Sequence, residues 1–361
     1  KTENKNEGAS EIEATVIQPI NDEALENAVI YEANIRQYSV EGTFTKFTED
    51  IPQLKELGVK IIWVMPIYPI STTKSKGSLG SYYAISDYTK VNPEFGNIED
   101  VKNLVKTAHE NGMYVILDWV ANHTGWDHVW LKEHPEYYTK NEVGEITHTV
   151  GTDWTDVADL NYDNMEMRAE MLKDMKYWVE ETDIDGFRCD VAAMVPLDFW
   201  EHTVAELKKV KPIFMLAEAW ESNLMENAFD MDYGWDTHHR MNHIAQGKEN
   251  VIDWDKRMAQ IDSMYQGKVW LLMQKLAELK KNNKALNGGK NAASYSKIYT
   301  SDNENVLIFS REKEGDKVTF MANLSKNDVE FTSEKEGESI DFFTNEKINF
   351  SKDDKIFLKA W

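Results

Sequence analysis

The stretch IDGFRCDVA, residues 184–192, carries an arginine and an aspartate two positions apart in an otherwise apolar run. Because side chains alternate along a β-strand, Arg188 and Asp190 share one face while Cys189 lies on the other. Taken alone, such a pair is most often a surface salt bridge. The neighbouring runs of the chain decide whether this strand instead lines a functional site.

Three further apolar runs, at 59–67, 113–120 and 212–220, alternate with helical patterns at 97–112, 164–182 and 196–211. The runs become polar near their ends, at Asp118, His123 and Glu218. Strands that alternate with helices predict parallel βαβ units, and polar carboxyl ends are typical of a TIM barrel. A doubly wound sheet has the same local pattern, but the chain has no glycine-rich phosphate turn, which argues against nucleotide binding.

Changes in composition and hydrophobic pattern along the sequence predict four regions. We expect a flexible leader at 1–27, a (β/α)8-type barrel at 28–286 with an inserted domain B at about 123–165, and an antiparallel β-sandwich at 287–361. The insertion is rich in Trp, Tyr and His and lacks a clean period, and long loops in compact domains are usually functional. After 288–289, short alternating runs separated by turn residues indicate the small β-domain.

Composition narrows the classes of partner. The 361 residues carry a net charge of −23, which disfavours nucleic acid and anionic membranes. The single cysteine, Cys189, excludes a disulfide within the chain, and no apolar run is long enough to span a bilayer. No organic cofactor is expected. The polar start, KTENKNEGASEIE, reads as a flexible leader left after processing or after trimming of the chain. If a signal peptide was removed, the protein is exported, to the medium, the periplasm or the cell surface.

Two carboxylates on neighbouring strands, one ionised and one protonated, fit glycoside hydrolysis. Arg188 is expected to hold Asp190 ionised, which suits a nucleophile. Glu218 follows an apolar run and precedes Trp220, and apolar surroundings raise a carboxyl pKa, which suits an acid. Each residue alone has a structural explanation; their joint position at strand ends favours a site.

At these residues the chain resembles the α-amylase family, glycoside hydrolase family 13. Five segments carry the resemblance in the family's order: LGSYYAISDY at 79–88 with NPEFG at 92–96, DWVANH at 118–123, ADLNYDN at 158–164, GFRCDVA at 186–192 and AEAW at 217–220. The resemblance implies a retaining hydrolase of α-1,4-glucosidic bonds in starch or maltooligosaccharides, acting through a covalent glycosyl-enzyme intermediate.

The resemblance also implies roles for individual residues. It makes Asp190 the nucleophile, Glu218 the general acid/base, and Arg188 the group that orients Asp190 and tunes it electrostatically. It implies that Tyr83 stacks on the sugar being cleaved, that His123 hydrogen-bonds the same sugar, and that Asp118 supports the site by hydrogen bonding. In members with a structural calcium ion, Asn122 and Asp159 match ligands. Calcium prefers oxygen donors, so these two are candidates for a Ca²⁺ site.

One family segment is missing. The fourth motif, Asn-His-Asp, whose aspartate stabilises the transition state, does not occur in the chain. About six βα units are visible where eight are expected, so the barrel is predicted to be incomplete. The segment was lost naturally, was removed by engineering, or is missing only from the sequence as written. A true deletion leaves two unpaired sheet edges, which another chain in an oligomer could cover.

Three functions follow from this pattern. The first is the amylase-type hydrolase, and the second is a catalytically impaired α-glucan-binding member that lacks the third aspartate. The third is a structural relative like the membrane-tethered ancillary subunits of transporters, which ranks last because a membrane-spanning run is lacking.

Overall fold

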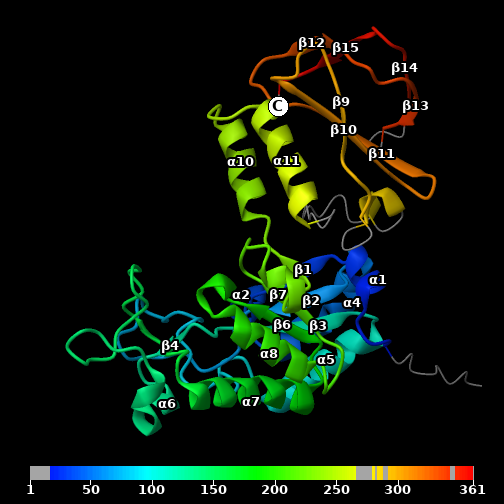
Figure 1. Ribbon diagram of the computed structural model, residues 1–361. Coiled ribbons are helices and arrows are strands. Elements are labelled where there is room, and N and C mark those ends of the chain that lie inside the picture. Colours follow the sequence, from blue (N-terminus) through cyan, green and yellow to red (C-terminus); the bar gives the residue numbers. More distant parts are fainter. Residues whose placement is uncertain (1–16, 266–278, 281–282, 288–291, 342–345, 361) are drawn as a thin grey trace, which may run out of the picture.

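The computed structural model describes residues 17–265, 279–280, 283–287, 292–341 and 346–360. Figure 1 shows a lower part built on a parallel sheet, an upper part of antiparallel strands, and two helices that stand beside the upper strands. Among the described residues, no helix is both long and apolar enough to cross a membrane.

The lower part is a six-stranded parallel sheet with the order β1-β2-β3-β6-β7-β8. Its strands are β1 (Ile30–Ala33), β2 (Ile61–Val64), β3 (Tyr114–Trp119), β6 (Gly186–Cys189), β7 (Phe214–Ala217) and β8 (Met231–Asp232). The helices around it are α1 (Asp22–Glu26), α2 (Ile35–Tyr38), α3 (Phe44–Glu49), α4 (Ile51–Glu56), α5 (Ile98–Glu110), α7 (Met165–Thr182), α8 (Leu197–Leu207) and α9 (Leu224–Asn227).

The two faces of the sheet bury different apolar sets. Alternate residues such as Ile62 and Val115 belong to the large core that the helices share, with Trp178 of α7 among its largest buried side chains. The other face carries Ile61 and Ile116, which pack in a separate, smaller cluster. The alternation of a β-strand therefore separates a helix-covered outer face from an inner face.

The barrel is not closed within the described residues. The sheet ends at β1 and β8, which are its edge strands. Part of the inner face is covered by the N-terminal segment, where Ile20, Leu25 and Ala28 are buried in the inner cluster. The structure thus confirms the prediction of an incomplete barrel of about six βα units.

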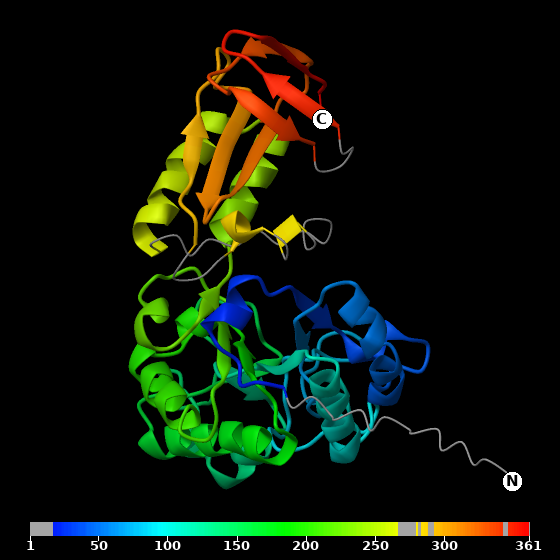
Figure 2. The same cartoon turned by 90° about the vertical axis from the view of Figure 1, so that its right-hand side faces the viewer.

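A helical hairpin leads from the sheet to the C-terminal strands. Helices α10 (Trp235–Ala245) and α11 (Val251–Tyr265) lie side by side and pack on one C-terminal sheet, as Figure 2 shows. Their buried Ile244, Val251 and Trp254 form a cluster with Leu307. This hairpin therefore packs on the C-terminal part of the protein.

The C-terminal part contains antiparallel pairs in three small sheets, ordered β11-β10-β9, β12-β15 and β13-β14. Its strands are β9 (Ser296–Ile298), β10 (Val306–Lys313), β11 (Asp316–Asn323), β12 (Val329–Thr332), β13 (Gly337–Ile340), β14 (Lys347–Phe350) and β15 (Lys355–Leu358). These strands fit the predicted β-sandwich, while the exact domain boundaries stay predictions.

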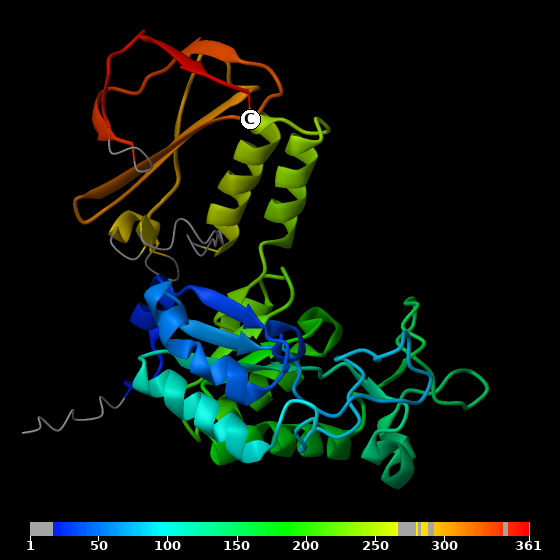
Figure 3. The ribbon, with the colours of Figure 1, turned by 180° about the vertical axis from the view of Figure 1, so that it is seen from behind.

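The predicted insertion contains β4 (His123–Gly125), α6 (Val129–Glu133) and β5 (Val157–Asp159). Strands β4 and β5 pair antiparallel, so the two ends of the insertion are held together where it leaves and rejoins the barrel. Figure 3 shows the insertion projecting sideways from the sheet.

Two stretches differ from what their sequence predicts. The strand-like run at 29–39 predicts one strand, but β1 ends at Ala33 and α2 begins at Ile35, with the Asn34 side chain accepting from the Gln37 N–H as an N-cap. The run at 47–58 predicts a single helix, but α3 ends at Glu49 and α4 begins at Ile51. The pattern at 269–283 also predicts a helix, and most of these residues lie outside the described ranges.

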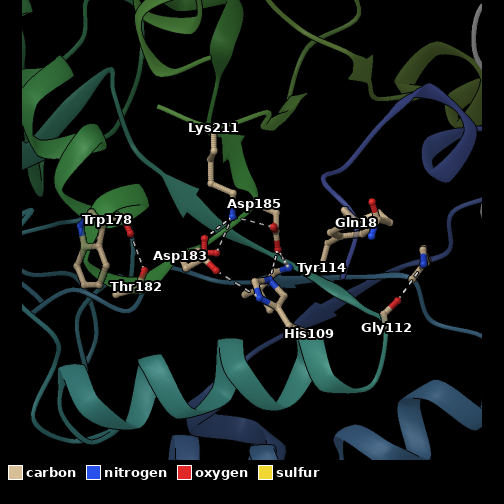
Figure 4. A network of polar contacts seen from close by, with 11 residues as sticks. Gln18, His109, Gly112, Tyr114, Trp178, Thr182, Asp183, Asp185 and Lys211 are labelled. Atoms are coloured by element: carbon tan, nitrogen blue, oxygen red, sulfur yellow. Dashed lines mark hydrogen bonds and ion pairs between the residues drawn. The ribbon is translucent and has the colours of Figure 1, made fainter. Parts of the chain in front are cut away.

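A charged network ties the elements together at the amino end of the sheet, opposite the strand ends that carry the predicted site (Figure 4). The buried carboxylate of Asp185 accepts from the Val115 N–H at 2.8 Å and contacts His109 Nε2 at 2.8 Å and Lys211 Nζ at 3.2 Å. Because the network joins α5, β3 and the starts of β6 and β7, we interpret it as structural.

Candidate active site

Arg188, on β6, is the centre of a buried polar cluster at the carboxyl ends of the strands. Its Nη1 donates to Asp118 Oδ1 and to Asp190 Oδ1, both at 2.9 Å, and its Nη2 lies 2.9 Å from Glu218 Oε2. The Arg188 side chain is only 4% exposed. The surface salt-bridge interpretation is therefore wrong: one guanidinium organises three carboxylates from three adjacent strands.

Asp118, on β3, is fully buried and is held by several donors. Besides Arg188, the indole N–H of Trp63 donates to its Oδ2 at 3.0 Å, and the Tyr83 hydroxyl donates to the same oxygen at 3.3 Å. A buried carboxylate costs much less when its oxygens accept hydrogen bonds and an opposite charge lies beside it. Asp118 thus holds the Arg188 and Tyr83 side chains in place through these hydrogen bonds.

Glu218 directly follows β7, and its surroundings differ from the prediction. Its Oε2 accepts from the Val191 N–H at 2.9 Å in addition to contacting Arg188, and Trp220 is 50% exposed. The apolar environment predicted for Glu218 is therefore wrong. Val191 itself has φ of 37° and ψ of 47°, a left-handed conformation that is costly for a β-branched residue. This turn aims the Val191 N–H at Glu218.

Two of the carboxyls beside Arg188, those of Asp190 and Asp118, have raised pKa values. Burial raises the pKa of Asp190 above its ordinary range, to about 8, and the Asp118 charge adds to the rise; Arg188 offsets only part of it. Burial likewise raises the pKa of Asp118, to about 6, against the opposing effect of Arg188. At Asp190 the effect of burial on the pKa therefore exceeds that of Arg188, in contrast to the expected dominance of the arginine.

Tyr83 and His123 lie beside this cluster. The Tyr83 hydroxyl reaches Asp118, and the Arg188 guanidinium lies 5.9 Å from the centre of the Tyr83 ring. His123 opens β4, its ring centre is 5.7 Å from that of Trp154, and burial lowers its pKa to about 4, so its imidazole is neutral. The structure thus brings all six predicted catalytic and sugar-binding residues to one end of the sheet, while their roles stay predictions.

Sequence reasoning missed three residues that contact or face Arg188. The Tyr233 hydroxyl accepts from Arg188 Nε at 3.0 Å, and the guanidinium stacks 4.8 Å from the centre of the Trp63 ring. Glu32, on the edge strand β1 and in register with Trp63, lies within electrostatic reach of Arg188 and Glu218. Alternation on β1, which places the charged Glu32 in a strand, was the signal that could have found Glu32.

The two predicted calcium ligands are bridged by a threonine. Asn122 Nδ2 donates to Thr149 Oγ1 at 2.9 Å, and Thr149 Oγ1 donates to Asp159 Oδ1 at 2.6 Å. Calcium needs six to eight oxygen donors, whereas here the Asn122 amide presents its N–H₂ group. Within the described ranges, no three His, Cys, Asp or Glu side chains gather as a metal site. Both candidate ligands are thus engaged with Thr149, and a Ca²⁺ ion at this position stays a prediction.

Comparison with known proteins places this site in a family. The family model described as the alpha-amylase catalytic domain matches residues 21–154 and 147–243. The chain is 28% identical over 242 residues to alpha-amylase 3 of Dictyoglomus thermophilum, covering 58% of this chain and 46% of that protein. It is 30% identical over 245 residues to the maltogenic alpha-amylase of Bacillus acidopullulyticus, covering 60% and 39%.

A solved structure agrees with the sequence comparison. The maltogenic alpha-amylase AmyB from Thermotoga neapolitana aligns with a TM-score of 0.82 at 27% identity, covering 93% of this chain and 97% of that one. Fold and site together define a (β/α)-barrel protein of the glycoside hydrolase type. The chain belongs to the alpha-amylase family. It spans less than half the length of the two curated relatives named above.

Proposed function

We propose that this protein is a retaining α-glucan hydrolase of the α-amylase type, acting on α-1,4-glucosidic bonds. The observation that carries the proposal is the contact of one buried guanidinium with Asp118, Asp190 and Glu218. Asp190 and Glu218 are held by the two terminal nitrogens of the same arginine. This closeness favours the retaining arrangement, with carboxyls about 5 to 5.5 Å apart, over the wider inverting one.

The reaction assigns each carboxyl one task. Glu218 donates its proton to the glycosidic oxygen while Asp190 attacks the anomeric carbon, so the leaving glucan departs as an alcohol and a glycosyl ester forms. Glu218 then takes a proton from water, the water oxygen attacks the same carbon, and Asp190 is released. Burial raises the pKa of Asp190, and the attack on the anomeric carbon requires this carboxyl in its ionised form while Glu218 supplies the proton.

Reducing-sugar release from soluble starch tests the proposal. Asp190→Asn is expected to lower the release rate by about three orders of magnitude or more, whereas Asp163→Asn, a matched change at an exposed turn residue, leaves it unchanged. The first product should be the α-anomer by NMR. Release that is insensitive to Asp190→Asn would refute the nucleophile assignment.

Binding of glucan without any release would instead support the impaired glucan-binding function that the missing Asn-His-Asp motif suggests. Export, a bound calcium ion and an oligomer stay predictions.

A further inference from the structure

A continuous chain of hydrogen bonds runs from the end of domain B to His123. Asp159 Oδ1 accepts from Thr149 Oγ1 at 2.6 Å, Thr149 Oγ1 accepts from Asn122 Nδ2 at 2.9 Å, and Asn122 Nδ2 lies 3.1 Å from His123 Nδ1. Strands β4 and β5 fix the two ends, because His123 pairs directly with Asp159. Asn122 and His123 are both buried.

The number of protons available determines which group donates in each of these hydrogen bonds. A carboxylate only accepts, so the single hydroxyl proton of Thr149 is committed to Asp159. The Thr149 oxygen can then only accept, which orients the Asn122 amide with its N–H₂ group toward Thr149. The second hydrogen of that group points to His123 Nδ1, which must therefore be the nitrogen without a proton.

We propose that Thr149 is a positioning residue that fixes His123 as the tautomer carrying its proton on Nε2. The Asp159 carboxylate orients the Thr149 hydroxyl, and that hydroxyl orients the Asn122 amide. Thr149 belongs to the insertion and not to the barrel, yet it determines which ring nitrogen of His123 carries the proton. Its functional meaning rests on the proposed function together with the hydrogen bond between His123 and the sugar that the family resemblance implies.

The same geometry gives Asn122 and Asp159 a role without a cation. The Thr149 hydroxyl lies between the two side chains that the family resemblance suggests as calcium ligands. A hydroxyl that donates to one and accepts from the other satisfies both. The junction of the insertion with the barrel is therefore held by hydrogen bonds, and chelation should not weaken it.

Two substitutions at one position separate the hydroxyl from the shape of the side chain. Thr149→Val keeps the branched volume and removes the hydroxyl, whereas Thr149→Ser keeps the hydroxyl. Long-range ¹H–¹⁵N NMR of the ¹⁵N-histidine-labelled full chain reports the tautomer, with His123→Gln to assign the signal. Wild type and Thr149→Ser should show the Nε2–H form; in Thr149→Val the ratio of Nε2–H to Nδ1–H should fall about fivefold to tenfold, the factor of one lost hydrogen bond.

An unchanged tautomer in folded Thr149→Val overturns the proposal. If that variant does not fold, Asn122→Asp, measured in EDTA, decides: a carboxylate cannot donate to Nδ1, so the proton should move to Nδ1, and retention of the Nε2–H form refutes the directed chain. EDTA or CaCl₂ should change neither the His123 signals nor the melting temperature of wild type; a change in either shows that a cation, not Thr149, links the two residues.

These measurements need no substrate, so they test the role of Thr149 independently of whether the protein hydrolyses glucan. If starch is bound, Thr149→Val should also weaken glucan affinity about fivefold to tenfold relative to Thr149→Ser.

Discussion

Replacing Asp118 with asparagine should lower the pKa of Asp190 by about one to two units. Both carboxylates accept from the same Nη1 of Arg188 at 2.9 Å, so the two accepting oxygens lie within about 5.8 Å of each other. At an effective dielectric constant of about 20, two like charges at that distance repel by about 3 kcal/mol. That energy corresponds to about two pKa units, and relaxation of the site reduces it.

The consequence is visible in the pH dependence of stability. A carboxyl whose pKa is raised in the folded state stabilises folding fully below its unfolded pKa near 4, and this contribution is lost as pH rises through the folded pKa. For wild type the loss extends through the values of about 6 for Asp118 and about 8 for Asp190. In Asp118→Asn the titration of residue 118 disappears, and the titration of Asp190 is complete at a lower pH than in wild type. The fall in unfolding free energy between pH 5 and 9 should therefore be about 3 kcal/mol smaller.

Urea unfolding followed by tryptophan fluorescence at pH 5 to 9 measures this slope. The amide also faces the donors of Arg188, Trp63 and Tyr83, which adds a destabilisation of about 1 to 3 kcal/mol that does not depend on pH. The slope is thus the diagnostic quantity, and Asp163→Asn should leave it unchanged. Parallel curves for wild type and Asp118→Asn would refute the coupling between the two carboxyls.

Two further predictions concern stability alone. Gly186→Ala should destabilise by about 4 kcal/mol or prevent folding, because φ is +146° and an added Cβ would overlap the Phe214 carbonyl oxygen. Gly112→Ala, also at positive φ but with open space around it, should cost only about 1 to 2 kcal/mol in the same urea titration. Burial raises the pKa of Asp174 to about 7, so its contribution is lost as pH rises from 4 through 7. Asp174→Asn should raise the melting temperature at pH 8 relative to wild type but not at pH 4, and an equal shift at both values would contradict this.

The polar ends of the apolar strands were readable from sequence because strand alternation and parallel pairing act locally. Asp118, Arg188 and Glu218 lie where that pattern places them, on adjacent strands. The incomplete barrel was likewise predicted from the count of units. Both inferences needed only the order of residues along the chain and the common direction of the strands.

The aromatic part of the site was not readable. Trp63 lies in an apolar strand, where a tryptophan is indistinguishable from core, and only the register with β3 brings its indole N–H to Asp118. Tyr233 follows a strand of two residues that gives almost no pattern. The left-handed turn at Val191 runs against the preference of a β-branched residue, so no local rule predicts it.

The protonation of the site was misread for a related reason. Sequence spacing reveals that Arg188 neighbours Asp190, but it does not reveal how many other carboxylates that arginine serves. Each added partner divides the same positive charge and adds a repulsion of its own, so the balance between burial and pairing reverses. The pKa of a carboxyl cannot therefore be inferred from one neighbouring arginine in the sequence when other strands bring further carboxylates to the same arginine.

The site can assemble in an open sheet because its organising contacts come from neighbouring strands. Asp118, Arg188 and Glu218 come from β3, β6 and β7, which hydrogen-bond to one another in that order, and closing the barrel adds nothing to those pairings. What closure would add is a wall on the far side of the inner face, toward the edges β1 and β8. In the proposed function, the missing segment therefore affects how the sugar is enclosed and how its hydroxyls are bound, while the placement of Asp190 and Glu218 is preserved.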